Sequence, residues 1–307
     1  MPDHDLIIVG AGVAGLTAAL VAGRHGLNVA VIASSSPGGQ IVNADRIENF
    51  PGIPQPIAGH ELGTLLFEQA EAAGAQFMLD TVEGLRAESD RWIVCSTIQE
   101  LSGGAVIIAA GSTLRKLGIP GEEEFLGKGV SYCASCDAPL FKSRYVCIIG
   151  GGDAAFDEAL TLVEHAAHVT IFHRGEAPRA QQRLRARVET IGNIAVESNT
   201  AVEEIVGGDA VTELRLRDSR TGAIREKKKV DGVFIAVGLD PATAFLRGFV
   251  KLDASGHIET DIVMRTSLAG VFAAGDIRAH SVAQLASVAG DGATAAISAF
   301  RYLKARR

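Results

Sequence analysis

The chain has 307 residues, 47% of them hydrophobic, which is enough for about two domains with separate cores. Its net charge of −7 at pH 7 argues against nucleic acid as a partner. Four cysteines do not make the disulfide framework of a secreted protein. The apolar stretch 6–22 follows two acidic residues and contains three glycines, so it is neither a signal peptide nor a membrane span. We therefore expect a cytoplasmic protein that binds no nucleic acid and no membrane.

Apolar runs and helical periodicities alternate along the chain, and the same order starts again about 140 residues later. Strands are predicted at 5–9, 28–32, 91–97, 104–109, 145–149, 169–173, 231–237 and 270–274. Helices are predicted from the first glycine turn to about 25, at about 59–73 and 154–164, and at 281–303. This order predicts an α/β protein with parallel sheets and two Rossmann-like dinucleotide-binding domains.

The last predicted strand and helix have no place in a simple two-domain split, so we expect the second domain to be inserted into the first. The expected boundaries are 1–114 for the first part of the first domain, 115–242 for the inserted domain, and 243–307 for the second part. The chain is expected to cross between the domains at about 113–118 and 239–245.

Two glycine-rich turns each follow a strand and open a helix, which is where a dinucleotide pyrophosphate binds. The first contains Gly10, Gly12 and Gly15, and Ala33 stands where an acidic ribose-binding residue would end the next strand. Ribose contacts are therefore expected from Ser34 or its neighbours. The residues assigned to the second nucleotide are Gly150, Gly152, Ala155, His173, Arg174 and Arg179. Guanidinium groups in place of a carboxylate favour the 2′-phosphate of NADP over the 2′-hydroxyl of NAD, although surface arginines of no special role would give the same pattern.

Cys133 and Cys136 are separated by two residues, a spacing that allows a reducible disulfide at a helix start. Asp137 adjoins the pair and is either a proton donor to a leaving thiolate or a helix cap. A zinc site would need two more ligands. Cys95 and Cys147 lie far apart within apolar strands, so both are expected in cores and no metal site is predicted.

With these residues placed, the whole chain resembles the low-molecular-weight thioredoxin reductases. The segments that carry the resemblance are Pro37-Gly38-Gly39-Gln40, Glu48-Asn49-Phe50-Pro51-Gly52, Ser131-Tyr132-Cys133-Ala134-Ser135-Cys136-Asp137, Val271-Phe272-Ala273-Ala274-Gly275-Asp276 and Gln284. Several motifs in the family's order are far more specific than any one of them.

The resemblance implies a flavoprotein disulfide reductase that is a homodimer and passes electrons from NADPH through FAD and the Cys133–Cys136 disulfide to thioredoxin. It implies that Cys136 faces the flavin and Cys133 attacks the partner's disulfide. Further FAD-binding residues implied by the resemblance are Gly39, Gln40, Asn49, Asp276 and Gln284.

The sequence departs from the family pattern at three places. Gly175 stands where the second of two arginines is usual. After the cysteine motif, Ala138-Pro139-Leu140-Phe141 stands where the family often has a glycine and two aromatics, and residues 279–282 before Gln284 are unusual. The first two departures lie where the electron donor and the protein partner would bind. They leave open a related flavin–dithiol enzyme that uses NADH or a ferredoxin, or that acts as a dithiol oxidase. A flavin-dependent binding protein without enzymatic activity is a third reading, disfavoured by the Cys133–Cys136 pair beside both nucleotide turns.

Overall fold

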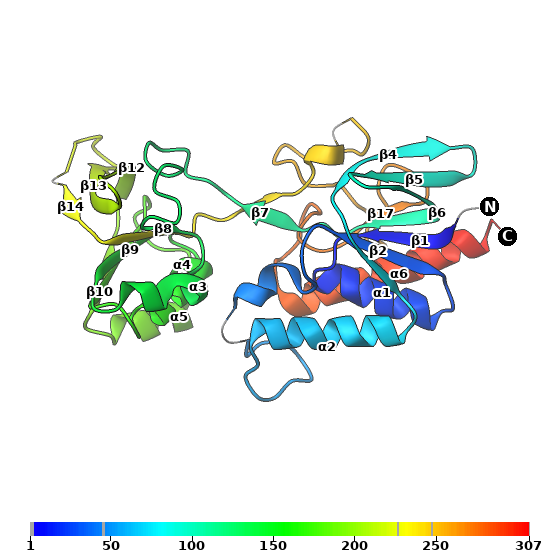
Figure 1. The fold of residues 1–307 in the computed structure, drawn as a ribbon, viewed down its shortest axis with the longest axis horizontal. Coiled ribbons are helices and arrows are strands. Elements are labelled where there is room, and N and C mark those ends of the chain that lie inside the picture. Colours follow the sequence, from blue (N-terminus) through cyan, green and yellow to red (C-terminus); the bar gives the residue numbers. More distant parts are fainter. Residues whose placement is uncertain (1–2, 45–46, 226, 247, 307) are drawn as a thin grey trace. The chain divides into compact units, whose positions relative to one another are not determined.

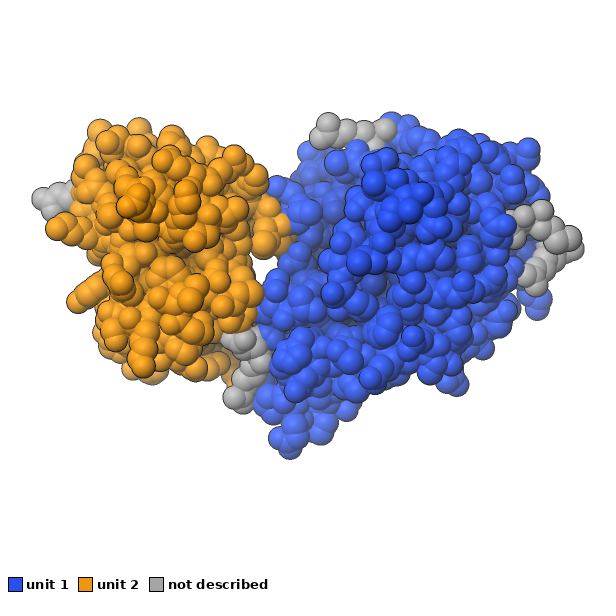
Figure 2. Space-filling view, viewed as in Figure 1, with its two compact units in different colours: residues 1–113, 240–307 blue, residues 114–239 orange. Residues whose placement is uncertain are grey.

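The computed structural model describes residues 3–44, 47–225, 227–246 and 248–306. The chain forms two compact units, which are coloured separately in Figure 2. Unit 1 consists of residues 1–113 and 240–307, and unit 2 of residues 114–239. Unit 2 thus interrupts the sequence of unit 1. The strands that carry the two crossings, β7 (Ser112–Leu114) and β16 (Leu239–Pro241), pair with each other.

A largely parallel sheet forms the centre of unit 1, with the strand order β3-β2-β1-β6-β5-β4 and with β17 paired to β6. The parallel strands are β1 (His4–Val9), β2 (Val29–Ala33), β3 (Gln76–Leu79), β6 (Glu100–Ile108) and β17 (Val271–Ala273). The antiparallel strands are β4 (Val82–Glu88) and β5 (Arg91–Ser96). A strand from the far side of the insertion, β17, therefore completes a sheet that begins with β1.

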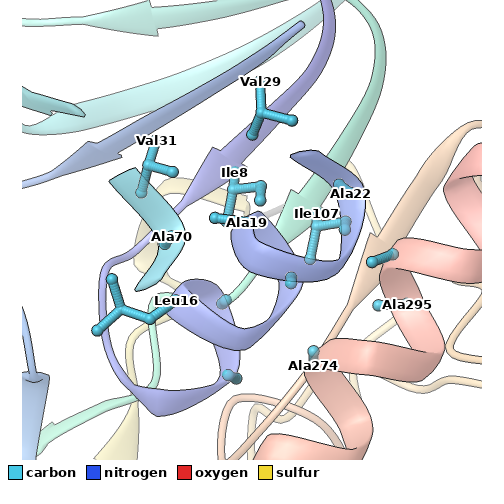
Figure 3. Close-up of a cluster of buried hydrophobic side chains, with 14 of the residues drawn as sticks. Ile8, Leu16, Ala19, Ala22, Val29, Val31, Ala70, Ile107, Ala274 and Ala295 are labelled. Carbon is cyan, nitrogen blue, oxygen red and sulfur yellow. The ribbon is translucent and has the colours of Figure 1, made fainter. Parts of the chain in front are cut away.

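Helices α1 (Val13–Arg24), α2 (Gly59–Ala72) and α6 (Leu285–Lys304) lie on one face of this sheet (Figure 1). Small side chains let α1 and α6 approach closely, and a Cβ on Gly292 would lie only 2.2 Å from the Ala14 carbonyl oxygen. The core beneath these helices contains Ile8, Leu16, Ala19, Ala22, Val29, Val31, Ala70, Ile107, Ala274 and Ala295 (Figure 3).

The opposite face of the unit 1 sheet has a core of its own, because successive strand residues point to opposite faces. Ile7 and Val9 of β1 lie in this second core, whereas Leu6 and Ile8 lie in the first. The second core is closed by β4, β5 and the 3-10 helix η3 (Ala244–Leu246). Both faces are covered, as the continuous apolar runs of the parallel strands require.

Unit 2 has a parallel sheet with the order β11-β10-β9-β15-β8. Its strands are β8 (Val130–Ser131), β9 (Tyr145–Ile149), β10 (His168–Phe172), β11 (Ile194–Glu197) and β15 (Gly232–Ile235). One face packs on the helices α3 (Ala134–Asp137), α4 (Asp153–Leu162) and α5 (Gln182–Glu189) and on η2 (Ala138–Phe141). The other face packs on the antiparallel strands β12 (Thr200–Gly207), β13 (Val211–Asp218) and β14 (Lys228–Lys229).

Two sequence predictions are wrong in detail. The last helix begins at Leu285 rather than at 281, because the backbone of His280 and Ala283 has a positive φ, at 62° and 49°, which a right-handed helix excludes. Cys147 is buried as predicted, but Cys95 is only half-buried and lies beside the charged side chains of Arg86 and Glu100.

Within the residues described, no helix is both long enough and apolar enough to cross a bilayer.

Candidate functional site

Unit 1 contains a cavity of about 900 Å³ at the carboxyl ends of its parallel strands. This volume lies within the range of about 300–1,000 Å³ that is usual for small-molecule and cofactor sites. Seven residues predicted from the sequence to bind FAD line it: Gly10, Gly12, Gly39, Gln40, Asn49, Asp276 and Gln284. The structure thus brings together residues that are as far apart in the sequence as Gly10 and Gln284.

The first glycine turn forms one wall of this cavity, and two of its glycines are required by close backbone contacts. Gly10 has a φ of +107°, and a Cβ there would lie 2.3 Å from the Ala109 carbonyl oxygen. A Cβ on Gly15 would lie 1.9 Å from the carbonyl oxygen of Gly10, so Gly15 supports the turn from beneath. Gly12 precedes α1, whose first turn carries no acidic residue. The amides that begin this helix can therefore receive a pyrophosphate.

Three serines follow β2 at the point where Ala33 replaces an acidic residue, and Ser34, Ser35 and Ser36 all line the cavity. Ribose contacts from Ser34 or its neighbours stay a prediction, and these hydroxyls lie where such contacts would be made. Gln40 lies in η1 (Gly39–Asn43), and its side-chain amide donates a hydrogen bond to the Ser112 carbonyl oxygen at 3.0 Å.

The loop between β17 and α6 brings Asp276 and Gln284 to the same cavity. Ser281 donates a hydrogen bond from its hydroxyl to the Asp276 carboxylate at 2.8 Å. Ala283, with its positive φ, directly precedes Gln284, the residue before α6. Left-handed backbone at a residue other than glycine is costly and collects at functional sites. The costly conformation here is that of Ala283, whereas Gln284 itself is extended, with φ −122° and ψ 137°.

A buried ion pair supports this loop from below. The Arg278 guanidinium donates to both oxygens of Asp291 on α6, at 2.5 and 2.9 Å, and to the Ala279 carbonyl oxygen at 3.1 Å. The amide of Gly275 donates to the same Asp291 carboxylate at 3.2 Å, and Asp291 is 6% exposed. The loop is therefore tied to α6 on both sides of Asp276.

Replacing Asp291 with Asn should lower the free energy of unfolding of the FAD-bound protein by about 3–5 kcal/mol, because the Arg278 guanidinium would stay buried without its charge partner. Urea unfolding followed by the release of flavin fluorescence measures this loss. The matched control is Glu259→Gln, which breaks an exposed pair with Lys251 and should cost less than about 1 kcal/mol. Equal losses in the two variants would contradict a supporting role for Asp291.

The second glycine turn lies in unit 2, between β9 and α4. A Cβ on Gly150 would lie 2.3 Å from the Ala236 carbonyl oxygen and 2.9 Å from the Cβ of Ala155, which explains a small residue at both places. The Gly151 carbonyl oxygen accepts hydrogen bonds from the amides of Arg179 and Ala180, at 2.7 and 3.1 Å. The segment after β10 is therefore fastened to the turn.

The basic residues assigned to the second nucleotide differ in their exposure to solvent. Arg174 and Arg179 are exposed near the fastened segment. His173 is buried, and its ring nitrogen Nε2 lies 2.8 Å from the Ser198 hydroxyl. Burial lowers the pKa of His173, so at pH 7 its ring is neutral and supplies no charge to a phosphate.

Cys133 and Cys136 form a disulfide, with their Cα atoms 5.4 Å apart. Cys133 is the N-cap of α3, and its sulfur accepts a hydrogen bond from the Cys136 amide at 3.2 Å. Cys136 is exposed and Cys133 is half-buried. A cap position places the Cys133 sulfur toward amide donors, which favour its thiolate after reduction.

Asp137 ends α3 and is half-buried. It precedes η2 without a side-chain capping bond, so capping does not account for it. In the part of the chain that the structure describes, no cluster of three His, Cys, Asp or Glu side chains is suited to a metal ion.

The sequence analysis did not identify the Arg278–Asp291 pair. A single signal was available: Asp291 is a charged residue in an otherwise small and apolar part of the last helix, between Gly290 and Gly292. A charge at such a position needs a partner, but the sequence does not say which one.

The sequence model of the pyridine nucleotide-disulphide oxidoreductase family matches residues 4–293 of this chain. The chain is 44% identical to a thioredoxin reductase of Treponema pallidum over 301 residues, which is 98% of this chain and 97% of that protein. The chain belongs to the thioredoxin reductase family. Its structure also matches the thioredoxin reductase of Lactococcus lactis with a TM-score of 0.96 and 36% identity, covering 99% of this chain and all of that one.

Family membership confirms the predicted fold of two Rossmann-like domains and makes the chain an oxidoreductase of the flavoprotein disulfide reductase type. Members of the family depend in general on FAD and NADPH. A ferredoxin-flavin thioredoxin reductase of Clostridium acetobutylicum is a more distant match, with a TM-score of 0.54 and 29% identity over 98% of each chain.

Proposed function

We propose that this protein reduces thioredoxin with NADPH, using FAD and the Cys133–Cys136 disulfide. The observation that carries the proposal is the disulfide at the start of α3, in the unit that also holds the second glycine turn, whereas unit 1 has a large cavity at the first turn. In the balanced reaction, oxidised thioredoxin, NADPH and a proton give the thioredoxin dithiol and NADP⁺. We further propose that the protein acts in the cytoplasm as a homodimer.

FAD fits the cavity of unit 1 by size and by its donor groups. Gly10 and Gly12 leave room for a pyrophosphate at α1, and Gly39, Gln40, Asn49, Asp276 and Gln284 also line the cavity. When bound, FAD supplies the chemistry that converts a two-electron hydride donor into reduction of a disulfide. Residues 1–114 and 243–307 thus form the proposed FAD domain.

NADPH is the proposed donor, and residues 115–242 the domain that binds it. Gly150 and Gly152 would receive the pyrophosphate at α4, and Arg174 and Arg179 would face the 2′-phosphate. The family's second arginine is absent at Gly175, and a hydrogen bond to a charged group contributes about 1.5–3 kcal/mol. NADH or a ferredoxin is therefore the alternative donor, and the Clostridium acetobutylicum relative shows that the fold occurs with a ferredoxin.

The two cysteines would divide the work on the partner. After reduction, the Cys133 thiolate attacks one sulfur of the thioredoxin disulfide, and a mixed disulfide forms as a thioredoxin thiolate leaves. Cys136 then attacks Cys133, which restores the internal disulfide and releases the second thiolate of thioredoxin. Asp137, directly after the pair, is the proposed proton donor to the leaving thiolate.

The test is a steady-state assay of the purified FAD-bound protein with NADPH or NADH, with and without oxidised thioredoxin. We expect thioredoxin-dependent oxidation of NADPH. Anaerobic flavin bleaching compares the two nucleotides as donors. If neither nucleotide bleaches the flavin, the donor is another reductant, and a reduced ferredoxin becomes the leading candidate. Rapid consumption of oxygen with a dithiol substrate would instead identify a dithiol oxidase.

Replacing Gly175 with Arg should raise the NADPH to NADH ratio of kcat/KM by about tenfold, because it adds a charged donor for the 2′-phosphate. The position accepts a side chain: its φ is not in the left-handed region, and a Cβ would meet its nearest neighbour at 3.6 Å. Gly192→Arg, at an exposed and open position of the same unit, is the control for added charge. An equal ratio in the two variants would exclude Gly175 as the determinant of donor choice.

A further inference from the structure

Unit 2 contains a buried carboxylate that the proposed chemistry does not use. Glu122 is 2% exposed. Its two oxygens accept hydrogen bonds from the Leu117 amide at 2.8 Å, the Gly118 amide at 2.7 Å and the Tyr132 hydroxyl at 2.5 Å. Three donors on one buried carboxylate satisfy most of its acceptor capacity, and these hydrogen bonds offset the free-energy cost of removing the charge from water.

The donors come from two segments with different positions in the chain. Leu117 and Gly118 belong to the entry segment, residues 114–118, with which unit 2 begins. Tyr132 directly precedes Cys133. Glu122 therefore links the start of the unit to the residue next to the disulfide.

Charge strengthens this link. Burial alone would raise the pKa of Glu122, but the hydrogen bonds from Tyr132 and from the two amides outweigh it and lower the pKa below its ordinary value. Burial and the Glu122 carboxylate together raise the pKa of Tyr132, so its hydroxyl stays a donor. All three bonds are thus donated to an ionised group, and such bonds are about twice as strong as neutral ones.

The main chain is held on both sides of Cys133, but by different contacts. Before Cys133, the short strand β8 pairs with β15, the Cys133 amide donates to the Ser131 hydroxyl at 3.0 Å, and that hydroxyl donates to the Cys133 carbonyl oxygen at 3.3 Å. After Cys133, Ala134 and Ala138 are buried in the core, whereas Cys136 and Pro139 are exposed and Leu140 is 77% exposed. Hydrogen bonds to strand β8 and to Ser131 therefore fix the main chain on the N-terminal side of the disulfide.

We propose that Glu122 is a positioning residue for the redox-active pair: by holding the Tyr132 hydroxyl and the entry-segment amides on one carboxylate, it fixes the main chain immediately before Cys133. The proposal rests on the redox role proposed above for Cys133 and Cys136. Fixing one half of a dithiol raises the effective concentration of its thiols toward each other, because less freedom is lost when the disulfide forms. Without Glu122, the disulfide is easier to reduce.

The experiment measures the equilibrium between the Cys133–Cys136 disulfide and dithiothreitol, which gives two electrons and two protons and becomes its own cyclic disulfide. The full-length FAD-bound protein is equilibrated without oxygen, and the free thiols of the two cysteines are alkylated and counted by peptide mass spectrometry. Tyr132→Phe removes only the hydroxyl, and Glu122→Gln removes the charge. Neither nucleotide nor thioredoxin is needed.

We expect the equilibrium constant for reduction to rise about five- to tenfold in Tyr132→Phe and in Glu122→Gln, and the double variant to match Glu122→Gln because both changes break one network. The controls are Tyr145→Phe, at a tyrosine 60% exposed, and Glu123→Gln, at a side chain 76% exposed. Both should stay within about twofold of the wild type.

An equilibrium constant unchanged in both variants overturns the proposal, even where their stability falls. If Glu122→Gln does not fold, the equilibrium constant of Tyr132→Phe alone decides whether the proposal stands. A failure of the proposed function looks different: the wild-type pair would resist reduction by dithiothreitol, or would be reduced normally while the protein shows no thioredoxin reductase activity.

Discussion

Replacing Cys136 with serine should reduce the turnover of thioredoxin to less than about one thousandth of the wild-type rate, because the mixed disulfide on Cys133 can no longer be resolved. The variant should therefore accumulate as a covalent complex with thioredoxin, visible as a band that dithiothreitol removes in non-reducing electrophoresis. Replacing Cys133 with serine should lower the turnover of thioredoxin to the same extent, but no covalent complex with thioredoxin should form.

Cys95→Ser is the matched control for these variants, because Cys95 is half-buried in unit 1 and takes no part in the disulfide. It should keep activity close to that of the wild type. Bleaching of the flavin by NADPH should also survive in all three variants, since it precedes the disulfide step. A complex that forms only with Cys133→Ser would reverse the roles of the two cysteines.

Replacing Gly15 with alanine should lower the FAD content of the purified protein at least about tenfold, because the new Cβ would overlap the Gly10 carbonyl oxygen and must displace the turn. The FAD content is read from the ratio of the flavin absorbance, at about 450 nm, to the protein absorbance, at about 280 nm. Unit 2 should be unaffected, so the Cys133–Cys136 disulfide should still form.

Gly290→Ala is the control for this change. Gly290 lies within α6, is exposed, and has open space around its Cβ position. Alanine there should leave the FAD content unchanged and stabilise the protein by about 0.5–1 kcal/mol. If Gly15→Ala also retained FAD, the turn would not need the close contact that the structure shows.

Most of the fold was predictable because its signals are local. A buried parallel strand, a glycine turn and a helix each leave a pattern within a few residues, and both turns lie where that pattern places them. The start of the last helix was not predictable from periodicity. Ser281 to Gln284 continue an acceptable helical sequence, and it is the left-handed backbone of His280 and Ala283 that excludes the helix there.

The candidate site was predictable where backbone shape or thiol chemistry restricts the residue, as at Gly10, Gly15 and the cysteine pair. It was not predictable where a side chain acts through a distant partner. Asp291 and Glu122 are single acidic residues without a motif, and their roles follow only from Arg278 and Tyr132, which the fold brings to them. Cys95 shows the same limit, because the charged neighbours that keep it from a core lie on other strands.

The interrupted sheet of unit 1 also has a consequence for synthesis. Unit 2 is one continuous stretch, residues 114–239, and every strand of its sheet has left the ribosome before residue 240 follows. In unit 1, by contrast, β6 lacks its neighbour β17, and α1 lacks α6 with Gly292 against Ala14, until residues 271–304 emerge. Because contiguous domains fold as units during synthesis, the dithiol unit is the first to acquire structure. Its cysteine pair is then already in a folded domain, while the nascent flavin cavity still lacks the residues that follow β17.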